Sequence, residues 1–202
     1  MRIRLSPSLI SLLFSNLAVI IMAVVSEWSL RETLWIYWLQ SIIIGIFQAA
    51  KMGGLEMFST AGVTVNGRTI LPTKETKTKI VLFFLFHYGF FHFVYAIFLA
   101  QSFRIAAWQA VVFPVIIFFA NHSLSFALNR QQDKAQKPNI GRMMLFPYAR
   151  IVPMHLVLML GSFLPNSIVT LVIFMLLKTF ADVAMHVLEH RQLVNEPADV
   201  IV

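Results

Sequence analysis

Hydrophobic residues along the chain fall into six long runs, separated by shorter polar segments. A bilayer core about 30 Å thick is crossed by about 20 apolar residues in an α-helix. The pattern therefore predicts six transmembrane helices, over residues 8–25, 34–50, 80–101, 105–128, 148–163 and 167–188. We expect an all-α membrane protein, a single transmembrane domain over residues 1–202 in which the six helices form a bundle.

Composition supports the use of lipid as solvent. Of the 202 residues, 58% are hydrophobic and only 12% are charged, whereas about 25% are charged in an ordinary soluble domain. A soluble domain of this length has too little interior to bury so many apolar side chains. A soluble globular fold, a disordered chain and a collagen-like chain are therefore excluded. Because the chain has no cysteine, disulfides, thiolate zinc sites and iron–sulfur clusters are excluded as well.

Two of the polar segments are long. In the loop 51–79, residues 63–70 alternate between apolar and polar positions around Asn66-Gly67. This dipeptide, flanked by such alternation, predicts a small β-hairpin after the second helix. The other segment, 129–147, is polar and is predicted to be a flexible loop.

Basic residues predict the orientation of the chain. Lys and Arg number two before the first helix and then one, five, one, five and none in successive loops. Such alternation follows the positive-inside rule. It places both termini, the hairpin and the loop 129–147 in the cytoplasm, most simply across a prokaryotic inner membrane. The net charge of +7 therefore indicates membrane orientation, with the lipid bilayer as partner, and we expect no nucleic-acid partner.

Ionisable residues inside the membrane are costly and count as functional candidates. Five of them are predicted to lie in one layer of the cytoplasmic leaflet, on four different helices: His87, His122, His155, Asp182 and His186.

His92 is five residues from His87, about 140° around a helix. It aligns instead with Tyr88 and Tyr95. A structural role is therefore the simpler interpretation for His92.

Imidazole and carboxylate groups are ligands for zinc and iron. Asp182 and His186 are four residues apart, so both could bind one divalent ion, and histidines from facing helices could complete the site. Arg150 and Lys178 would position an anion such as a lipid phosphate. A metal-bound water would support hydrolytic chemistry, and an iron site would support redox chemistry.

The residues also resemble an uncharacterised, domain-of-unknown-function family of prokaryotic polytopic membrane proteins. The resemblance rests on WLQSIIIGIF (38–47), HYGF (87–90), PYARIVPMH (147–155) and LKTFADVAMH (177–186). The resemblance points to five residues as candidates for a functional role: Arg150, His155, Lys178, Asp182 and His186. It implies no established activity. Where this chain has Gln40, the family has an acidic residue, so one candidate ligand is an amide here.

Three other functions fit the same residues. The protein could be a non-catalytic accessory or assembly subunit of a larger membrane complex, with the buried histidines joining helices through hydrogen bonds. Two histidines on facing helices could hold a haem, or histidine and aspartate could relay protons in a transporter. Lys178 and Asp182 could equally form a buried ion pair. The sequence leaves open whether the protein is an enzyme.

Overall fold

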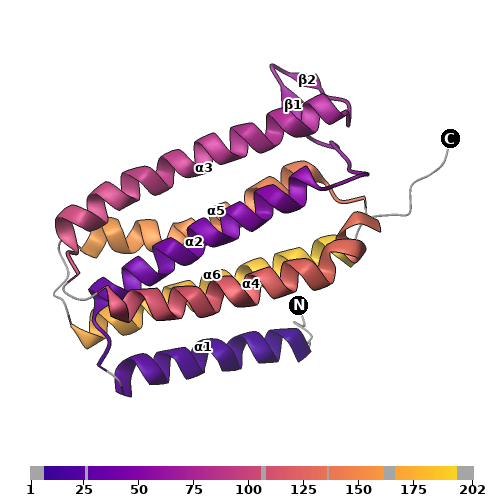
Figure 1. Cartoon of the computed structure of the whole chain (residues 1–202). Coiled ribbons are helices and arrows are strands. Elements are labelled where there is room, and N and C mark those ends of the chain that lie inside the picture. Colours follow the sequence, from indigo (N-terminus) through magenta and orange to yellow (C-terminus); the bar gives the residue numbers. More distant parts are fainter. Residues whose placement is uncertain (1–6, 26, 106–107, 136, 162–166, 195–202) are drawn as a thin grey trace. The chain divides into compact units, whose positions relative to one another are not determined.

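The computed structural model describes residues 7–25, 27–105, 108–135, 137–161 and 167–194, and these residues are mostly helical (Figure 1). The helices are α1 (Pro7–Val25), α2 (Leu30–Gly53), α3 (Lys74–Ser102), α4 (Gln109–Ala135), α5 (Ile140–Gly161) and α6 (Ile168–Val194). Two short strands, β1 (Thr64–Val65) and β2 (Arg68–Thr69), lie between α2 and α3.

The helices of the described residues correspond to the six predicted helical segments and differ from them mainly at their ends. Within the described residues, α2 and α3 are each long and apolar enough to cross a membrane. Several helices extend past the apolar runs, because polar residues also form helix and hydropathy detects only the apolar part. Residues 129–135 belong to α4, and Ile140 begins α5, so much of the segment 129–147 is helical where a loop was predicted.

The chain divides into two compact units. One comprises Met1–Leu30 together with Val152–Val202, and the other is Arg31–Ile151. The second unit contains α2, α3, α4, the hairpin and the first half of α5, and it holds most of the contacts considered below.

Helix α2 is the central element of the unit Arg31–Ile151, because it contacts the three other helices. Trp38 donates a hydrogen bond to a backbone carbonyl of α3, and Gln48 donates one to the Met143 carbonyl of α5 over 2.9 Å. The ring of Phe47 packs against Phe119 and Phe126 of α4. Hydrogen bonds and aromatic packing thus fix α2 among its neighbours.

A glycine of α2 makes room for a side chain of α3. A Cβ atom added at Gly45 would lie 2.4 Å from Cε1 of Tyr88, far inside van der Waals contact. The phenol of Tyr88 continues past Gly45 and donates to the Ser41 carbonyl over 2.8 Å. The Ser41 hydroxyl lies 2.8 Å from the same phenol oxygen. Since that phenol hydrogen is already used, Ser41 Oγ is the donor in the second bond.

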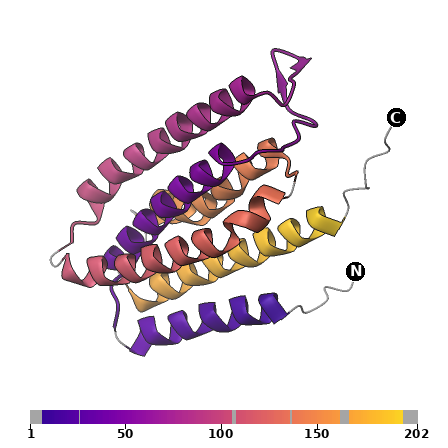
Figure 2. The same ribbon diagram turned by 45° about the vertical axis from the view of Figure 1, so that its right-hand side comes forward.

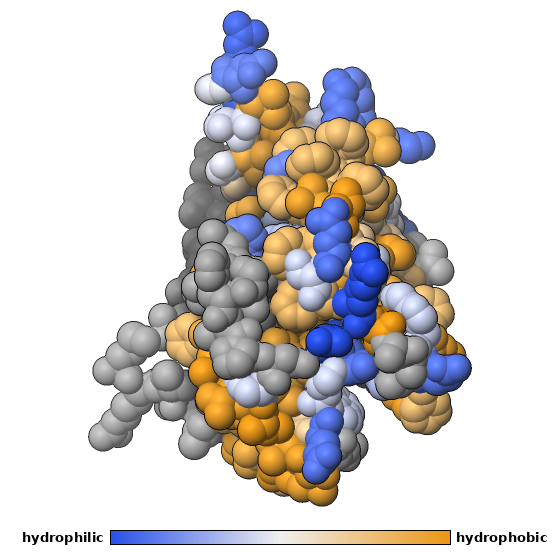
Figure 3. Space-filling model, turned by 90° about the vertical axis from the view of Figure 1, so that its left-hand side faces the viewer, coloured by the Kyte–Doolittle hydropathy of each residue, from blue (hydrophilic) through white to orange (hydrophobic). Residues whose placement is uncertain are grey.

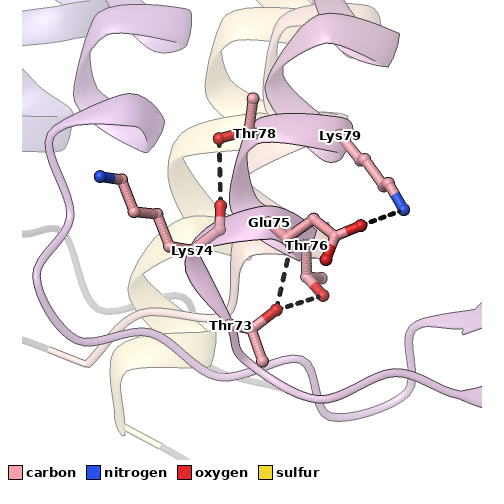
Figure 4. Close-up of polar contacts among 6 residues, drawn as sticks. All are labelled: Thr73, Lys74, Glu75, Thr76, Thr78 and Lys79. Carbon is pink, nitrogen blue, oxygen red and sulfur yellow. Dashed lines mark hydrogen bonds and ion pairs between the residues drawn. The ribbon is translucent and has the colours of Figure 1, made fainter.

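The start of α3 is capped. Thr73 Oγ1 accepts a hydrogen bond from the Thr76 amide over 3.2 Å, as an N-cap residue does. One turn on, the Lys79 ammonium lies 2.6 Å from the Glu75 carboxylate. Figure 4 shows the side chain of Lys74 extending away from this ion pair. The polar residues of 74–79 thus form the first turns of α3, ahead of its apolar part.

The predicted hairpin is present, and it turns at the predicted residues. Thr64 pairs with Thr69 and Val65 pairs with Arg68 in an antiparallel ladder. Asn66 and Gly67 have φ values of 52° and 73°, the positive values that a two-residue type I′ turn requires.

The segment around the hairpin is anchored to the helices. Ser59 forms two backbone hydrogen bonds at the start of α5. Its amide donates to the Pro138 carbonyl, and its carbonyl accepts from the Ile140 amide. The Asn139 side-chain amide donates to the Ala61 carbonyl over 2.8 Å. The Lys77 ammonium donates to the Leu55 carbonyl over 2.6 Å. Hydrogen bonds to α3 and to the start of α5 therefore hold the connection between α2 and α3 in place.

In the other unit, α1 packs against α6. The Lys178 ammonium of α6 donates to the Asn16 side-chain carbonyl of α1 over 2.8 Å. Asn16 is buried. A polar pair thus joins α1 and α6.

Candidate functional site

The buried face of α3 carries several polar groups. Its buried residues follow helical spacing: Phe84, Tyr88, His92, Tyr95 and Leu99. Three of these five side chains can form hydrogen bonds. Because α2 supplies Trp38 and Ser41 to the same face, a polar and aromatic stripe runs between the two helices.

His92 is the histidine of this stripe, and only 3% of its surface is exposed. Its Nδ1 lies 2.9 Å from the Tyr88 carbonyl. Because a carbonyl only accepts, Nδ1 carries the hydrogen and Nε2 holds a lone pair. Within the described residues, Nε2 has no hydrogen-bond partner. The backbone carbonyl of His92 accepts from Trp38 Nε1 over 3.0 Å, so both backbone and side chain take part in packing.

His87, a predicted metal ligand, lies on a different side of α3. Its Nδ1 is 2.8 Å from the Tyr148 phenol oxygen of α5. The ring of Phe83 stacks on the imidazole with centroids 5.2 Å apart. His87 is therefore held by α5 and by its own helix, and the predicted separation from His92 is confirmed by these different partners.

His122 lies in an aromatic environment. The ring of Phe118, one turn earlier on α4, stacks on it with centroids 4.2 Å apart. Phe47 of α2 lies 6.0 Å away by the same measure. The residue thus contributes to the contact between α2 and α4.

The remaining predicted site residues lie on α5 and α6. His155 is exposed, and Lys178 bonds to Asn16 as described above. The helices carrying Arg150, Asp182 and His186 are described, but these three side chains lie outside the described part of the structure.

Convergence of the five predicted ligands stays a prediction. Among the side chains that the structure describes, no three histidine, aspartate or glutamate residues lie close enough to hold one metal ion. His87 and His122 belong to the unit Arg31–Ile151, whereas His155, Asp182 and His186 belong to the other unit.

Two contacting residues were missed by sequence reasoning. Tyr148 could have been recognised in the sequence, because it follows Pro147 in an apolar run and a phenol in such a run needs a hydrogen-bond partner. Asn16 had a similar signal, as an amide in the middle of an apolar helix. Both partners are far away in sequence, 61 residues from Tyr148 to His87 and 162 from Asn16 to Lys178.

Taken together, the chain is a mostly helical protein with a small β-hairpin, and two of its described helices are suited to cross a membrane. A family model described as "Family of unknown function (DUF6498)" matches residues 2–199. The chain therefore belongs to this family. No curated protein and no solved structure matches it.

Proposed function

We propose that the protein is an integral membrane protein. The observation that carries this proposal is the distribution of side chains around α3, whose outer face is more apolar than its inner face. The large hydrophobic residues exposed on α3 have exposed fractions of 43% to 78%, and they are Leu82, Phe83, Leu85, Phe86, Phe90, Phe93, Val94 and Ile97.

Water does not tolerate such a face readily. Soluble monomers rarely expose a continuous apolar patch above a few hundred Å², whereas eight large residues in 16 positions of α3 are exposed here. On the face drawn in Figure 3, hydrophobic residues predominate and hydrophilic ones form small groups. A hydrocarbon environment accommodates this surface without cost, and the 29 residues of α3 extend about 43 Å at 1.5 Å per residue, enough to cross a bilayer.

We extend the proposal to six membrane-spanning helices of a polytopic prokaryotic inner-membrane protein, with both termini in the cytoplasm. The alternation of basic residues supports this orientation. Because the chain has no cysteine, single cysteines can be placed at Lys137 and Pro197 and labelled from either side. Both should react only from the cytoplasmic side, and opposite sides for the two positions would remove the sixth span.

Within the membrane, the contacts favour a non-catalytic role as an accessory or assembly subunit. The described polar side chains mostly join helices: Trp38 and Ser41 to α3, Gln48 to α5, His87 to Tyr148, and Lys178 to Asn16. Hydrogen bonds of this kind stabilise membrane bundles modestly, by about 0.6 kcal/mol each. A protein built in this way offers rigid apolar faces to lipid and to other membrane proteins.

Metal binding is the second candidate, and the hydrogen bond between His87 and Tyr148 favours it. In the tautomer in which Nδ1 donates to the phenol, Nε2 presents a lone pair, which is how metal-ligating histidines are usually oriented. Zinc or iron would then be held by residues from the set His87, His122, His155, Asp182 and His186, with Arg150 and Lys178 positioning an anion.

One experiment separates the two candidates. Purified protein should contain no stoichiometric zinc or iron and show no Soret band if it acts without a metal or haem. Under the metal proposal it should contain metal, which Asp182→Ala or His186→Ala should abolish while the protein still inserts. Under the non-catalytic proposal, the same substitutions should leave metal at background and lower only the unfolding temperature.

A further inference from the structure

The hairpin between α2 and α3 has two chemically different faces. Cross-strand partners in an antiparallel ladder point to the same side. Val65 and Arg68 therefore share one face, and Thr64 and Thr69 share the other. One face pairs a branched apolar side chain with a cation, and the other carries two hydroxyls.

The Val65–Arg68 face has similar neighbours in sequence. Val65 is 55% exposed and Leu71 is 74% exposed. Arg68 and Lys74 are exposed too. Within the described residues, neither the Arg68 guanidinium nor the Lys74 ammonium makes an ion pair or a side-chain hydrogen bond. By contrast, Lys79 is neutralised by Glu75.

The position of the hairpin fits the surface of a bilayer. It stands beside the first turns of α3 and projects away from α2 (Figures 1 and 2). Those turns end where the apolar part of α3 begins, near Ile80. The bonds from Lys77, Ser59 and Asn139 hold the segment in place. An isolated two-stranded hairpin is at best marginally stable in water, so these anchors explain how it persists.

We propose that the Val65–Arg68 face of the hairpin, with Leu71 and Lys74, binds the cytoplasmic surface of the membrane. Val65 and Leu71 enter the interface between headgroups and acyl chains. Arg68 and Lys74 bind the phosphates of anionic phospholipids, since a guanidinium and an ammonium are both phosphate ligands. The inference rests on the proposed membrane insertion of α3.

The charge of the segment supports an anionic partner. Residues 51–79 contain five basic residues (Lys51, Arg68, Lys74, Lys77 and Lys79) and two acidic ones (Glu56 and Glu75), a net charge of 5 − 2 = +3. Basic residues next to a membrane helix are attracted to anionic headgroups, each by about fivefold in affinity. The adjoining apolar side chains make a lipid surface a better fit than a free anion.

Spin labels test the proposal in lipid nanodiscs that contain phosphatidylglycerol. The variants Val65→Cys and Thr64→Cys report the two hairpin faces, and Phe86→Cys reports insertion of α3. We expect the label at position 65 to be several-fold more accessible to oxygen than to a soluble nickel chelate, with the reverse at position 64. Adding Arg68→Gln and Lys74→Gln should weaken the surface-bound state by about fivefold per charge removed. Nanodiscs made of phosphatidylcholine without phosphatidylglycerol should weaken it as well.

Each other outcome is decisive. Equal nickel accessibility at positions 64 and 65, with an oxygen-accessible label at position 86, overturns the hairpin proposal and leaves membrane insertion intact. Protection of position 65 from both reagents means that protein covers this face, and it also overturns the proposal. Nickel accessibility at position 86 overturns the proposed membrane function itself.

Discussion

The buried face of α3 is more polar than its exposed face, which is the reverse of a helix on the surface of a soluble protein. The buried face includes Tyr88, His92 and Tyr95, while the exposed face is built from phenylalanine and aliphatic residues. In water the hydrophobic effect would favour the reverse arrangement. In lipid there is no gain from hiding apolar side chains, and polar groups need partners inside the protein.

The comparison also explains which residues fix the structure. If α3 crosses the membrane as proposed, one apolar side chain should replace another on its outer face at little cost, because lipid is a fluid solvent. The inner face is specific, because Tyr88 fits against Gly45 and bonds to Ser41. Substitutions on the two faces should therefore have different consequences, which the following predictions test.

The largest effect is expected from a charge on the outer face. Phe90 is exposed and lies near the middle of the apolar part of α3. Phe90→Arg should disfavour membrane insertion by about 2.5–3.5 kcal/mol, the cost of arginine at the centre of a spanning helix. The fraction of α3 inserted by a translocon reporter measures this. Phe90→Leu is the matched control and should insert normally. Unchanged insertion of Phe90→Arg would contradict contact of this face with the hydrocarbon.

A smaller effect is expected where the two helices touch. Gly45→Ala puts a methyl group against the ring of Tyr88 and should displace it from Ser41. We expect a loss of about 1–3 kcal/mol, as for other overpacked interiors, measured by denaturant unfolding in detergent micelles.

Gly89 provides the matched control on α3, one residue after Tyr88. A Cβ added there meets nothing within 4 Å. Gly89→Ala should therefore be neutral or stabilise the helix by up to about 1 kcal/mol. Equal effects of the two glycine substitutions would contradict the contact between Gly45 and the Tyr88 ring.

The smallest effect concerns the hydrogen bonds between these helices. Tyr88→Phe keeps the ring and removes the phenol that bonds to Ser41, so it should cost about 1 kcal/mol. A double-mutant cycle with Ser41→Ala isolates the pair and should give a coupling energy of about 0.6 kcal/mol. A coupling energy of zero would mean that the two side chains do not interact.

Local sequence patterns predicted the elements that depend on neighbouring residues. Asn66-Gly67 specifies its turn because few other residues adopt positive φ at both positions, and the structure confirms it. The start of α3 at Lys74 was missed by six residues. Hydropathy detects only the apolar part from Ile80, although Thr73 is a recognisable N-cap residue.

The candidate site was harder to predict, because it depends on which helix packs where. Depth favoured His87 over His92, yet His92 is the more enclosed of the two. The alignment of His92 with Tyr88 and Tyr95 placed it on the face that is buried, but periodicity does not show which helix covers that face. In the same way, the contact of Lys178 with Asn16 requires knowledge that α1 packs on α6. The pairing of Lys178 with Asp182, four residues away on the same helix, stays a prediction, because the Asp182 side chain lies outside the described part of the structure.

A cysteine scan of α3 in lipid nanodiscs tests the central claim most directly. Spin labels at successive positions from Ile80 to Ala100 would report accessibility to oxygen and to a soluble nickel chelate. Membrane insertion predicts oxygen maxima at Phe83, Phe86, Phe90, Phe93 and Ile97, minima at Phe84, Tyr88, His92, Tyr95 and Leu99, and little nickel accessibility at any of them. High nickel accessibility along the phenylalanine face, or oxygen maxima on the tyrosine and histidine face, would contradict the account.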